Sequence, residues 1–192
     1  MGRLLAGLLV GVLALLGQDQ AGAAEADDSQ AWEALRAGRA VLLLRHATAP
    51  GIGDPEHFQL GDCATQRNLD QQGREEAQRW GELLRRQRIE RPRLFSSRWC
   101  RALDTAREMG LGAVEALPAL DSFFGARMRA GQQTAELVER VNGLMLGTVM
   151  VLVSHQVNIS ALTGLYPASG EGLILARPLT VPARVLARIP AP

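Results

Sequence analysis

The sequence predicts an α/β fold, a three-layer α/β/α sandwich around a mostly parallel central sheet. Short apolar runs of strand length alternate along the chain with longer segments of helical periodicity. The run Val-Leu-Leu-Leu at 41–44 shows no polar alternation, which is typical of strands buried on both faces of a sheet. A chain of 192 residues without a linker or an internal repeat is expected to form a single domain over residues 24–192.

The expected strands are short apolar segments bounded by turn residues. After 41–44 they cover 94–97, 114–117 and 148–153. Two further segments near the C-terminus, 173–175 and 185–187, are expected as edge strands.

The expected helices begin at capping residues and carry an apolar face. Asp28 and Ser29 can cap a first helix that Gly38 ends, and Asp70 can cap the second. The second helix should bury Trp80 and its apolar neighbours on one face. In chain order the expected helices cover residues 29–37, 71–88, 99–109, 134–146 and 157–162.

The N-terminal segment, residues 1–23, has the pattern of a signal peptide. Arg3 precedes an apolar run from Leu4 to Leu16, and Ala21-Gly22-Ala23 offers a cleavage site. The run is shorter than the roughly 20 residues that span a bilayer, although an uncleaved anchor helix is the alternative. The protein is therefore expected to be exported, in a bacterium to the periplasm, with no stable membrane insertion after cleavage.

Export determines how the two cysteines are interpreted. In an oxidising compartment Cys63 and Cys100 are expected to form a disulfide, which the entropic model values at roughly 3–4 kcal/mol. Two free thiols are the alternative, with Cys100 on a half-buried helix. The net charge of +1 lacks the basic excess of a nucleic-acid-binding protein, so no nucleic-acid partner is expected.

Polar residues suited to phosphate chemistry follow the buried strands. Arg45 and His46 follow the first strand, residues 97–101 follow the second, and Ser154-His155 follows the fourth. Ligands bind beyond the carboxyl ends of parallel strands, so these residues should converge on one crevice. The paired N–H groups of an arginine guanidinium can bind a phosphate dianion. One imidazole can act as a nucleophile, and the other can act as a hydrogen-bond donor.

A metal site is the competing use of two histidines. No third ligand stands at a suitable spacing beside His46 and His155, and the adjacent arginines would repel a cation. A site with no metal and no cofactor is expected.

Four motifs in residues 40–165 carry a family resemblance. They are V-L-L-L-R-H-A (41–47), L-D-x-x-G-x-x-x-A (69–77), S-S-x-x-x-R-A-x-x-T-A (96–106) and V-L-V-S-H (151–155). Their order and spacing resemble the histidine phosphatase superfamily, branch 1, although Ala47 stands where the family usually has glycine. The resemblance implies a phosphoglycerate-mutase-like fold.

The resemblance also implies a role for each matching residue. His46 is the expected nucleophile, which becomes phosphohistidine. Arg45 and Arg101 are expected to clamp the phosphoryl oxygens, and His155 to donate to the same group. Arg98 falls outside the motif's arginine position and is expected at the surface or the substrate rim.

The resemblance also offers a position for the general acid. Many members carry a glutamate after the third strand, and Asp121 stands in that position. Asp121 could protonate the leaving group, or it could merely cap a turn. Without an acid the enzyme would favour good leaving groups, as the family's phosphohistidine phosphatases do.

The segment 47–68 is expected to be a long functional loop, because it is rich in glycine and proline. It lacks the Glu and Asn of the family's mutases, so mutase activity is not expected. Its His57, Phe58, Asp62 and Arg67 could cover the crevice and select the substrate, and His57 by itself is expected to be a solvated loop residue rather than a catalyst. A disulfide would pin this loop beside Arg101.

The sequence therefore predicts a metal-independent phosphoric monoester hydrolase acting on a small-molecule phosphate ester or a phosphoprotein, phosphohistidine included. One alternative is a non-catalytic phosphate-ligand binding protein of the cell envelope on the same fold. Another is an envelope structural or interaction protein, which an exposed Phe123-Phe124 pair and a proline-containing C-terminus would permit.

Overall fold

The computed structural model describes residues 19–192, with side chains from Asp28 onward. The expected signal peptide lies outside the described residues except for 19–23, which belong to the first helix. Within residues 19–192 one sheet has the order β3-β2-β4-β1-β5-β6. Its strands are β1 (Ala40–Arg45), β2 (Arg93–Ser96), β3 (Val114–Ala116), β4 (Met150–Ser154), β5 (Gly172–Ala176) and β6 (Val185–Ile189).

The sheet is mixed, with a parallel half and an antiparallel half. β1, β4, β2 and β3 pair in parallel, whereas β5 pairs antiparallel with both β1 and β6. The expectation that both C-terminal strands lie at the edge is therefore wrong for β5. Its residues 172–175 are buried, because β5 is hydrogen-bonded on both sides and covered on both faces.

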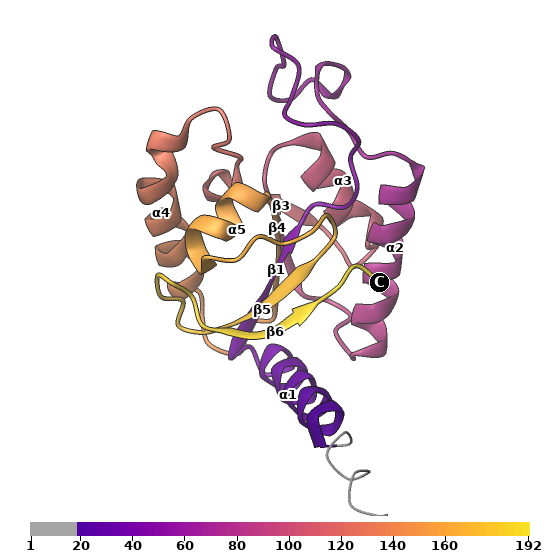
Figure 1. Cartoon of the computed structure of the whole chain (residues 1–192), viewed down its shortest axis with the longest axis vertical. Coiled ribbons are helices and arrows are strands. Elements are labelled where there is room, and N and C mark those ends of the chain that lie inside the picture. Colours follow the sequence, from indigo (N-terminus) through magenta and orange to yellow (C-terminus); the bar gives the residue numbers. More distant parts are fainter. Residues whose placement is uncertain (1–18) are drawn as a thin grey trace, which may run out of the picture.

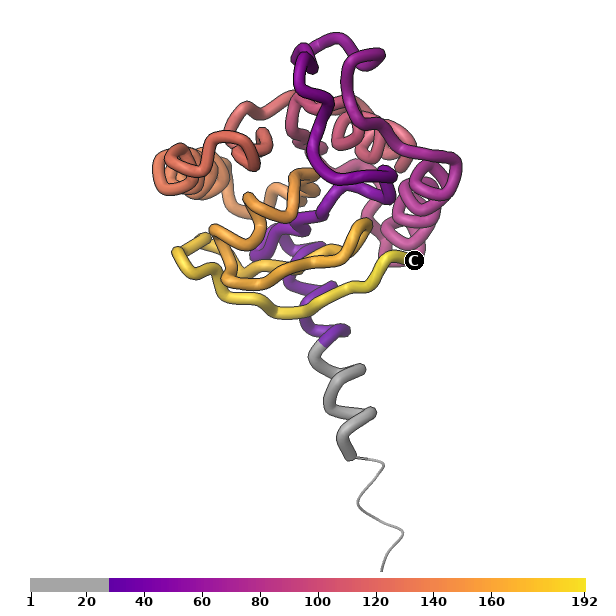
Figure 2. The backbone as a smooth tube through the Cα atoms, turned by 45° about the horizontal axis from the view of Figure 1, so that its top comes forward, coloured from indigo at the N-terminus to yellow at the C-terminus, as the bar shows by residue number. Residues whose placement is uncertain are grey.

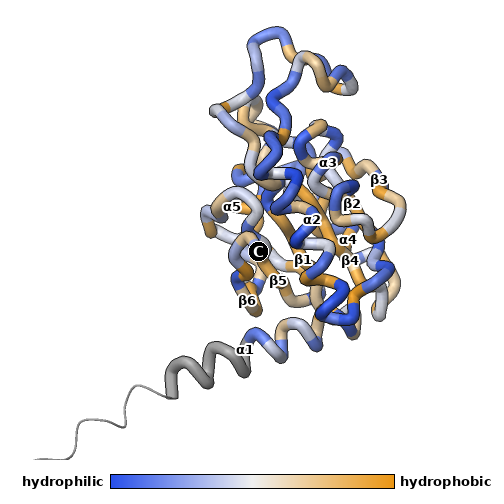
Figure 3. The backbone as a smooth tube through the Cα atoms, turned by 90° about the vertical axis from the view of Figure 1, so that its right-hand side faces the viewer, coloured by the Kyte–Doolittle hydropathy of each residue, from blue (hydrophilic) through white to orange (hydrophobic). Residues whose placement is uncertain are grey.

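Helices cover both faces of the sheet and complete the predicted three-layer sandwich (Figure 1). Leu42 and Leu44 of β1 pack with the helices on one face, while Val41 and Leu43 pack with those on the other. The first face carries α1 (Asp19–Arg36), α2 (Gln71–Arg86) and α3 (Cys100–Glu108), and the second carries α4 (Ala130–Asn142) and α5 (Gln156–Thr163). Figure 3 shows the hydrophobic strands enclosed by helices whose outer sides are hydrophilic.

Helix boundaries differ from the expected ones where the chain enters or leaves a helix. α4 begins at Ala130 rather than at 134, because a short 3₁₀ turn at 127–129 leads directly into it. It ends at Asn142, before Gly143, rather than reaching 146. Asp70 caps α2 as expected, its carboxylate accepting a hydrogen bond from the Gly73 amide.

Gly73 also decides how close α2 lies to the loop that follows β1. A Cβ atom at this position would lie 2.0 Å from the carbonyl oxygen of Thr48, so only glycine permits the contact. The loop, residues 47–68, then projects beyond the carboxyl end of β1, at the opposite end of the molecule from α1 (Figures 1 and 2).

Two further features of the described chain bear on the predictions. Cys63 and Cys100 form a disulfide with a Cα–Cα distance of 5.7 Å, which joins the 47–68 loop to the first residue of α3. Over residues 19–192, none of the helices has the length and apolar character needed to cross a membrane.

Candidate active site

Two histidines lie side by side because β1 and β4 are neighbouring parallel strands. Arg45 at the end of β1 is in register with Ser154 at the end of β4. The next residue along each strand is a histidine, and the His46 amide donates to the Ser154 carbonyl. The ring centroids of His46 and His155 are 5.3 Å apart, and both side chains are buried.

The His46 ring is held with one nitrogen free to act as a nucleophile. Its Nδ1 lies 2.8 Å from the Ala47 carbonyl oxygen, which can only accept, so Nδ1 carries the proton. The lone pair is therefore on Nε2, which faces Arg101 at 3.2 Å from its Nε. Burial, followed by the nearby Arg101 charge, lowers the pKa of His46 to about 3, so the imidazole is neutral at physiological pH.

Arg101 lies in the first turn of α3 and presents two separate pairs of N–H groups. Its Nε and Nη2 point toward the two histidines, at 3.2 Å from His46 Nε2 and 3.5 Å from His155 Nδ1. Its Nη1 and Nη2 point the other way, toward the Asp54 carboxylate at 2.7 and 3.2 Å. The guanidinium is 3 % exposed, so these contacts are made away from solvent.

His155 is the first member of a hydrogen-bonded chain that leads away from the pocket. Its Nε2 lies 2.8 Å from the Ser97 hydroxyl oxygen, and that hydroxyl lies 3.3 Å from the Asp121 carboxylate. The Ser97 hydroxyl donates its proton to the Asp121 carboxylate, so its oxygen accepts a hydrogen bond from His155 Nε2. The other ring nitrogen of His155, Nδ1, therefore faces Arg101 as an acceptor. Burial lowers the pKa of His155 most, and the nearby His46 and Arg101 lower it further, so that it lies well below its usual value.

Asp121 lies behind the pocket, at the far end of this chain. Its carboxylate accepts from the Arg98 amide at 2.8 Å and from the Arg98 side chain at 2.7 Å. It is not among the residues that line the pocket, although its neighbour Ser122 is. The structure thus pairs Asp121 with Arg98, and its role as a general acid stays a prediction. Arg98 is half-exposed, in line with the expected surface residue.

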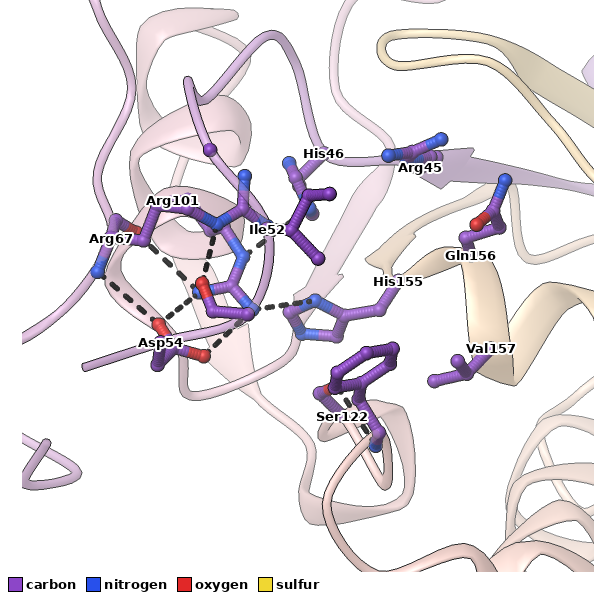
Figure 4. A pocket seen from close by; sticks show the side chains of 13 residues that line it. Arg45, His46, Ile52, Asp54, Arg67, Arg101, Ser122, His155, Gln156 and Val157 are labelled. Atoms are coloured by element: carbon purple, nitrogen blue, oxygen red, sulfur yellow. Dashed lines mark hydrogen bonds and ion pairs between the residues drawn. The ribbon is translucent and has the colours of Figure 1, made fainter. Parts of the chain in front are cut away.

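The pocket joins four of the predicted site residues, namely Arg45, His46, Arg101 and His155. It has a volume of about 260 Å³ and lies beyond the carboxyl ends of the strands, as predicted (Figure 4). The Arg45 Nη1 donates to the Pro167 carbonyl, whereas its Nε is buried without a hydrogen-bond partner among the described residues.

Charge in the pocket is predominantly positive. Arg45, Arg67 and Arg101 line it together with a single carboxylate of the described chain, that of Asp54. An unpartnered buried N–H beside excess positive charge favours an anion with several acceptor oxygens. In residues 28–192 no group of three His, Cys, Asp or Glu side chains is arranged to hold a metal ion.

The 47–68 loop supplies site residues that the sequence reasoning missed. Asp54 and Ile52 line the pocket, and so does Arg67, which the sequence offered only as a covering residue. Figure 4 shows all three side chains beside Arg101 and His46. The available signal was the Gly51-Ile-Gly-Asp54 turn, because paired glycines before an acidic residue allow a loop to reverse direction and aim its carboxylate inward.

Other loop and rim predictions have mixed outcomes. His57 is exposed, in line with a solvated loop residue. Phe123 is 5 % exposed and belongs to the interior, so the expected exposed pair is wrong, whereas its neighbour Phe124 is half-exposed and lines the pocket.

Comparison with solved structures places the fold among phosphatases. The protein histidine phosphatase SixA complexed with tungstate is similar over 79 % of this chain and 97 % of its own, with a TM-score of 0.55 and 17 % identity. Phosphoserine phosphatase from Entamoeba histolytica is similar over 78 % and 96 %, with a TM-score of 0.56 and 13 % identity. Mycobacterial glucosyl-3-phosphoglycerate phosphatase is similar over 77 % and 96 %, with a TM-score of 0.53 and 19 % identity.

Sequence comparison identifies the family directly. A search of curated protein sequences found no match. The model of the histidine phosphatase superfamily (branch 1) matches residues 41–144, a stretch that contains the first three motifs and most of the pocket. The chain belongs to the histidine phosphatase superfamily, branch 1.

Proposed function

We propose that this protein is a phosphatase that hydrolyses a phosphate monoester or phosphohistidine through a phosphohistidine intermediate on His46. The observation that carries the proposal is the geometry of His46. Its proton is fixed on Nδ1, its Nε2 lone pair faces the pocket, and its lowered pKa keeps the ring neutral.

The surrounding groups suit the transfer of a phosphoryl group. Arg45 and Arg101 would bind its oxygens with the N–H groups that face the pocket, and excess positive charge would stabilise the charge of the transition state. A bond forms between His46 Nε2 and phosphorus as the bond to the leaving group breaks. Water then attacks the phosphohistidine, which releases inorganic phosphate and restores the imidazole.

The position of the carboxylates bears on the leaving group. Asp121 is paired with Arg98 outside the pocket, and hydrogen bonds and charge from Arg101 lower the pKa of Asp54 against the effect of burial, so Asp54 is ionised. Neither is a ready proton donor. The site therefore favours substrates whose leaving group departs easily, such as phosphohistidine or an activated ester.

The test uses p-nitrophenyl phosphate, whose leaving group departs unaided. The parent protein should turn it over and yield an acid-labile, base-stable phosphoenzyme, and His46→Ala should do neither. His57→Ala is the matched control, because His57 is exposed on the 47–68 loop and outside the pocket. Turnover retained in His46→Ala, or phosphate binding without turnover in the parent, would contradict the proposal in favour of another mechanism or a binding protein.

A further inference from the structure

Arg101 is held from behind by the Asp54 carboxylate. The two oxygens of Asp54 each meet one terminal nitrogen of the guanidinium, Oδ1 to Nη1 at 2.7 Å and Oδ2 to Nη2 at 3.2 Å. This end-on pairing leaves the lateral pair, Nε–H and the second Nη2–H, directed at the space between His46 and His155. A planar guanidinium with one edge fixed in this way presents the other edge in a defined direction.

Asp54 is itself fixed by a contact from Trp99 and by a second contact from the far end of its own loop. Oδ2 accepts from the Trp99 indole at 3.0 Å, and Oδ1 accepts from the Arg67 amide at 3.2 Å. The side chain is 9 % exposed. Gly51 and Gly53 before it have φ of 91° and 72°, a backbone region that other residues rarely adopt, and this lets the loop turn Asp54 inward.

From this arrangement we propose that Asp54 is the positioning residue that aims the lateral N–H pair of Arg101 at the phosphoryl group. The inference rests on the proposed function only in taking the anion between the histidines to be a phosphoryl group. When that anion enters, its oxygens replace the two histidine nitrogens as acceptors for Nε and Nη2, while the bond between Asp54 and Arg101 persists.

Two other roles for Asp54 make different predictions. A general acid would have to be protonated, yet the pKa of Asp54 is lowered because Arg101 and Trp99 hydrogen-bond to it against the effect of burial. An internal competitor would have to leave Arg101 before phosphate could bind, so its removal would tighten phosphate binding. A positioning residue does the opposite, because its removal lets the guanidinium swing away.

The experiment measures the binding of inorganic phosphate to the intact protein by calorimetry, alongside kcat/KM. Asp54→Asn should weaken phosphate binding about tenfold or more, the scale of one charge-assisted hydrogen-bonded contact. Glu56→Gln, an exposed change on the same loop, is the matched control and should have no effect. Trp99→Phe removes one bond to Asp54 and should give a smaller loss, which keeps the test sound if Asp54→Asn folds poorly.

A double-variant cycle separates positioning from a general structural effect. If Asp54 acts through Arg101, Asp54→Asn should add nothing to the loss already caused by Arg101→Ala. Three results would overturn the inference. The first is additive losses in the double variant, and the second is unchanged or tighter phosphate binding in both Asp54→Asn and Trp99→Phe. The third is a parent protein that binds no phosphate. A parent that binds phosphate but releases none from esters would contradict the proposed function alone.

A second, independent observation concerns the mouth of the same pocket. Ile52, Phe124 and Val157 line it from three separate segments of the chain, and Ile52 is 92 % exposed and Phe124 49 %. Figure 4 shows Ile52 and Val157 on different sides of His155. An apolar patch that continues a charged pocket is typical of a ligand-binding surface.

Apart from the two histidines, uncharged polar side chains are few in the pocket lining of the described chain, namely Ser122 and Gln156, and each already makes one hydrogen bond. The Gln156 amide donates to the Pro167 carbonyl at 3.2 Å, and the Ser122 hydroxyl accepts from the Phe124 amide at 3.3 Å. We infer that the mouth takes an apolar group attached to the phosphate, such as the aryl group of an activated ester, rather than a sugar with many hydroxyl groups. This deepens the proposed function by naming its substrate class.

Phosphonates of rising chain length test this without requiring turnover. Binding from methyl- to hexylphosphonate should tighten by up to about threefold to fourfold per methylene, the value for full burial of one CH₂. Phe124→Ser and Ile52→Ser should flatten that series, whereas Met128→Ser, fully exposed and outside the pocket, should not. Equal affinity along the series, or tighter binding of glucose 6-phosphate than of the hexyl compound, would overturn the inference.

Discussion

Two carboxylate–arginine pairs flank the histidines, and they differ in where the arginine lies. Asp54 pairs with Arg101, whose side chain is 3 % exposed, whereas Asp121 pairs with Arg98, whose side chain is 46 % exposed. Both carboxylates are nearly buried, at 9 % exposure in each case. The first pair reaches the histidines through the arginine, and the second reaches His155 through Ser97.

The difference shows how one short segment serves two purposes. Arg98 and Arg101 both belong to the segment between β2 and the first turn of α3, yet only Arg101 faces the pocket. An exposed ion pair contributes little free energy, whereas a buried one fixes geometry and is costly to break. The Asp54–Arg101 pair is therefore expected to govern activity, and the Asp121–Arg98 pair to support the histidine from outside.

The largest expected effect compares the two arginines directly. Arg101→Ala should lower kcat/KM by about a hundredfold or more, since it removes donors to the transition state and leaves Asp54 buried and unpaired. Arg98→Ala should lower kcat/KM only a few-fold, because the Arg98 side chain that pairs with Asp121 is half-exposed. Steady-state kinetics on p-nitrophenyl phosphate measure kcat/KM for both variants. Equal losses would contradict the proposed difference between the two arginines.

A smaller effect on kcat/KM is expected from Asp121→Asn, on the order of tenfold, because an amide replaces the carboxyl group that contacts Ser97 and Arg98. The loss should be equal for alkyl phosphates and for p-nitrophenyl phosphate, since Asp121 lies outside the pocket. Parallel kcat/KM measurements on both substrates test this. A loss confined to alkyl phosphates, together with normal turnover by Asp121→Glu, would reinstate Asp121 as the general acid.

The disulfide should affect only the Asp54–Arg101 pair, because Asp54 belongs to the 47–68 loop that the disulfide anchors. Replacing Cys63 and Cys100 by serine should lower the free energy of unfolding by roughly 3 kcal/mol and weaken phosphate binding a few-fold. Thermal unfolding and calorimetry provide the two readouts. In the Asp54→Asn background the same replacement should no longer weaken phosphate binding. A further loss there would mean that the disulfide acts on the site by another route.

The smallest expected effect is that of acidic pH on kcat/KM, which should stay nearly constant. Because the pKa of His46 is about 3, kcat/KM corrected for substrate ionisation should not fall between about pH 7 and pH 5. A fall with a midpoint near the ordinary histidine value would show that His46 is not held neutral by burial and Arg101.

The same low pKa has the opposite consequence for stability. Between about pH 6.5 and pH 3 the unfolded chain binds a proton at His46 and the folded chain does not, so stability declines as the pH falls. His46→Asn should reduce the acid-induced drop in Tm. An unchanged drop would indicate that other groups, such as His155 and the carboxylates, cause it.

The parallel half of the sheet was predictable because its signals are local. The apolar run before Arg45-His46 and the run before Ser154-His155 each specify a buried strand that ends at a histidine. Neighbouring parallel strands then bring those ends together. The histidine pair and its two arginines follow from this topology.

The Asp54 contact was not predictable in the same way, because it depends on a long-range loop conformation. Asp54 and Arg101 are separated by 47 residues, and no periodicity specifies where a glycine-rich loop will point. The pairing of Asp121 with Arg98 was not predictable for a related reason. A motif position gives the residue's place in the chain, but it does not identify the side chain that will hydrogen-bond to its carboxylate.

The Cys63–Cys100 bond also changes the effective concentration at which Asp54 meets Arg101. Along the chain the two are 47 residues apart, but the bond bypasses 37 of these and leaves a tether of about ten. For a flexible chain, loop-closure entropy makes that shorter tether worth about 1.4 kcal/mol, or roughly tenfold in the local concentration of the carboxylate. The oxidised chain thus keeps Asp54 close to its guanidinium partner.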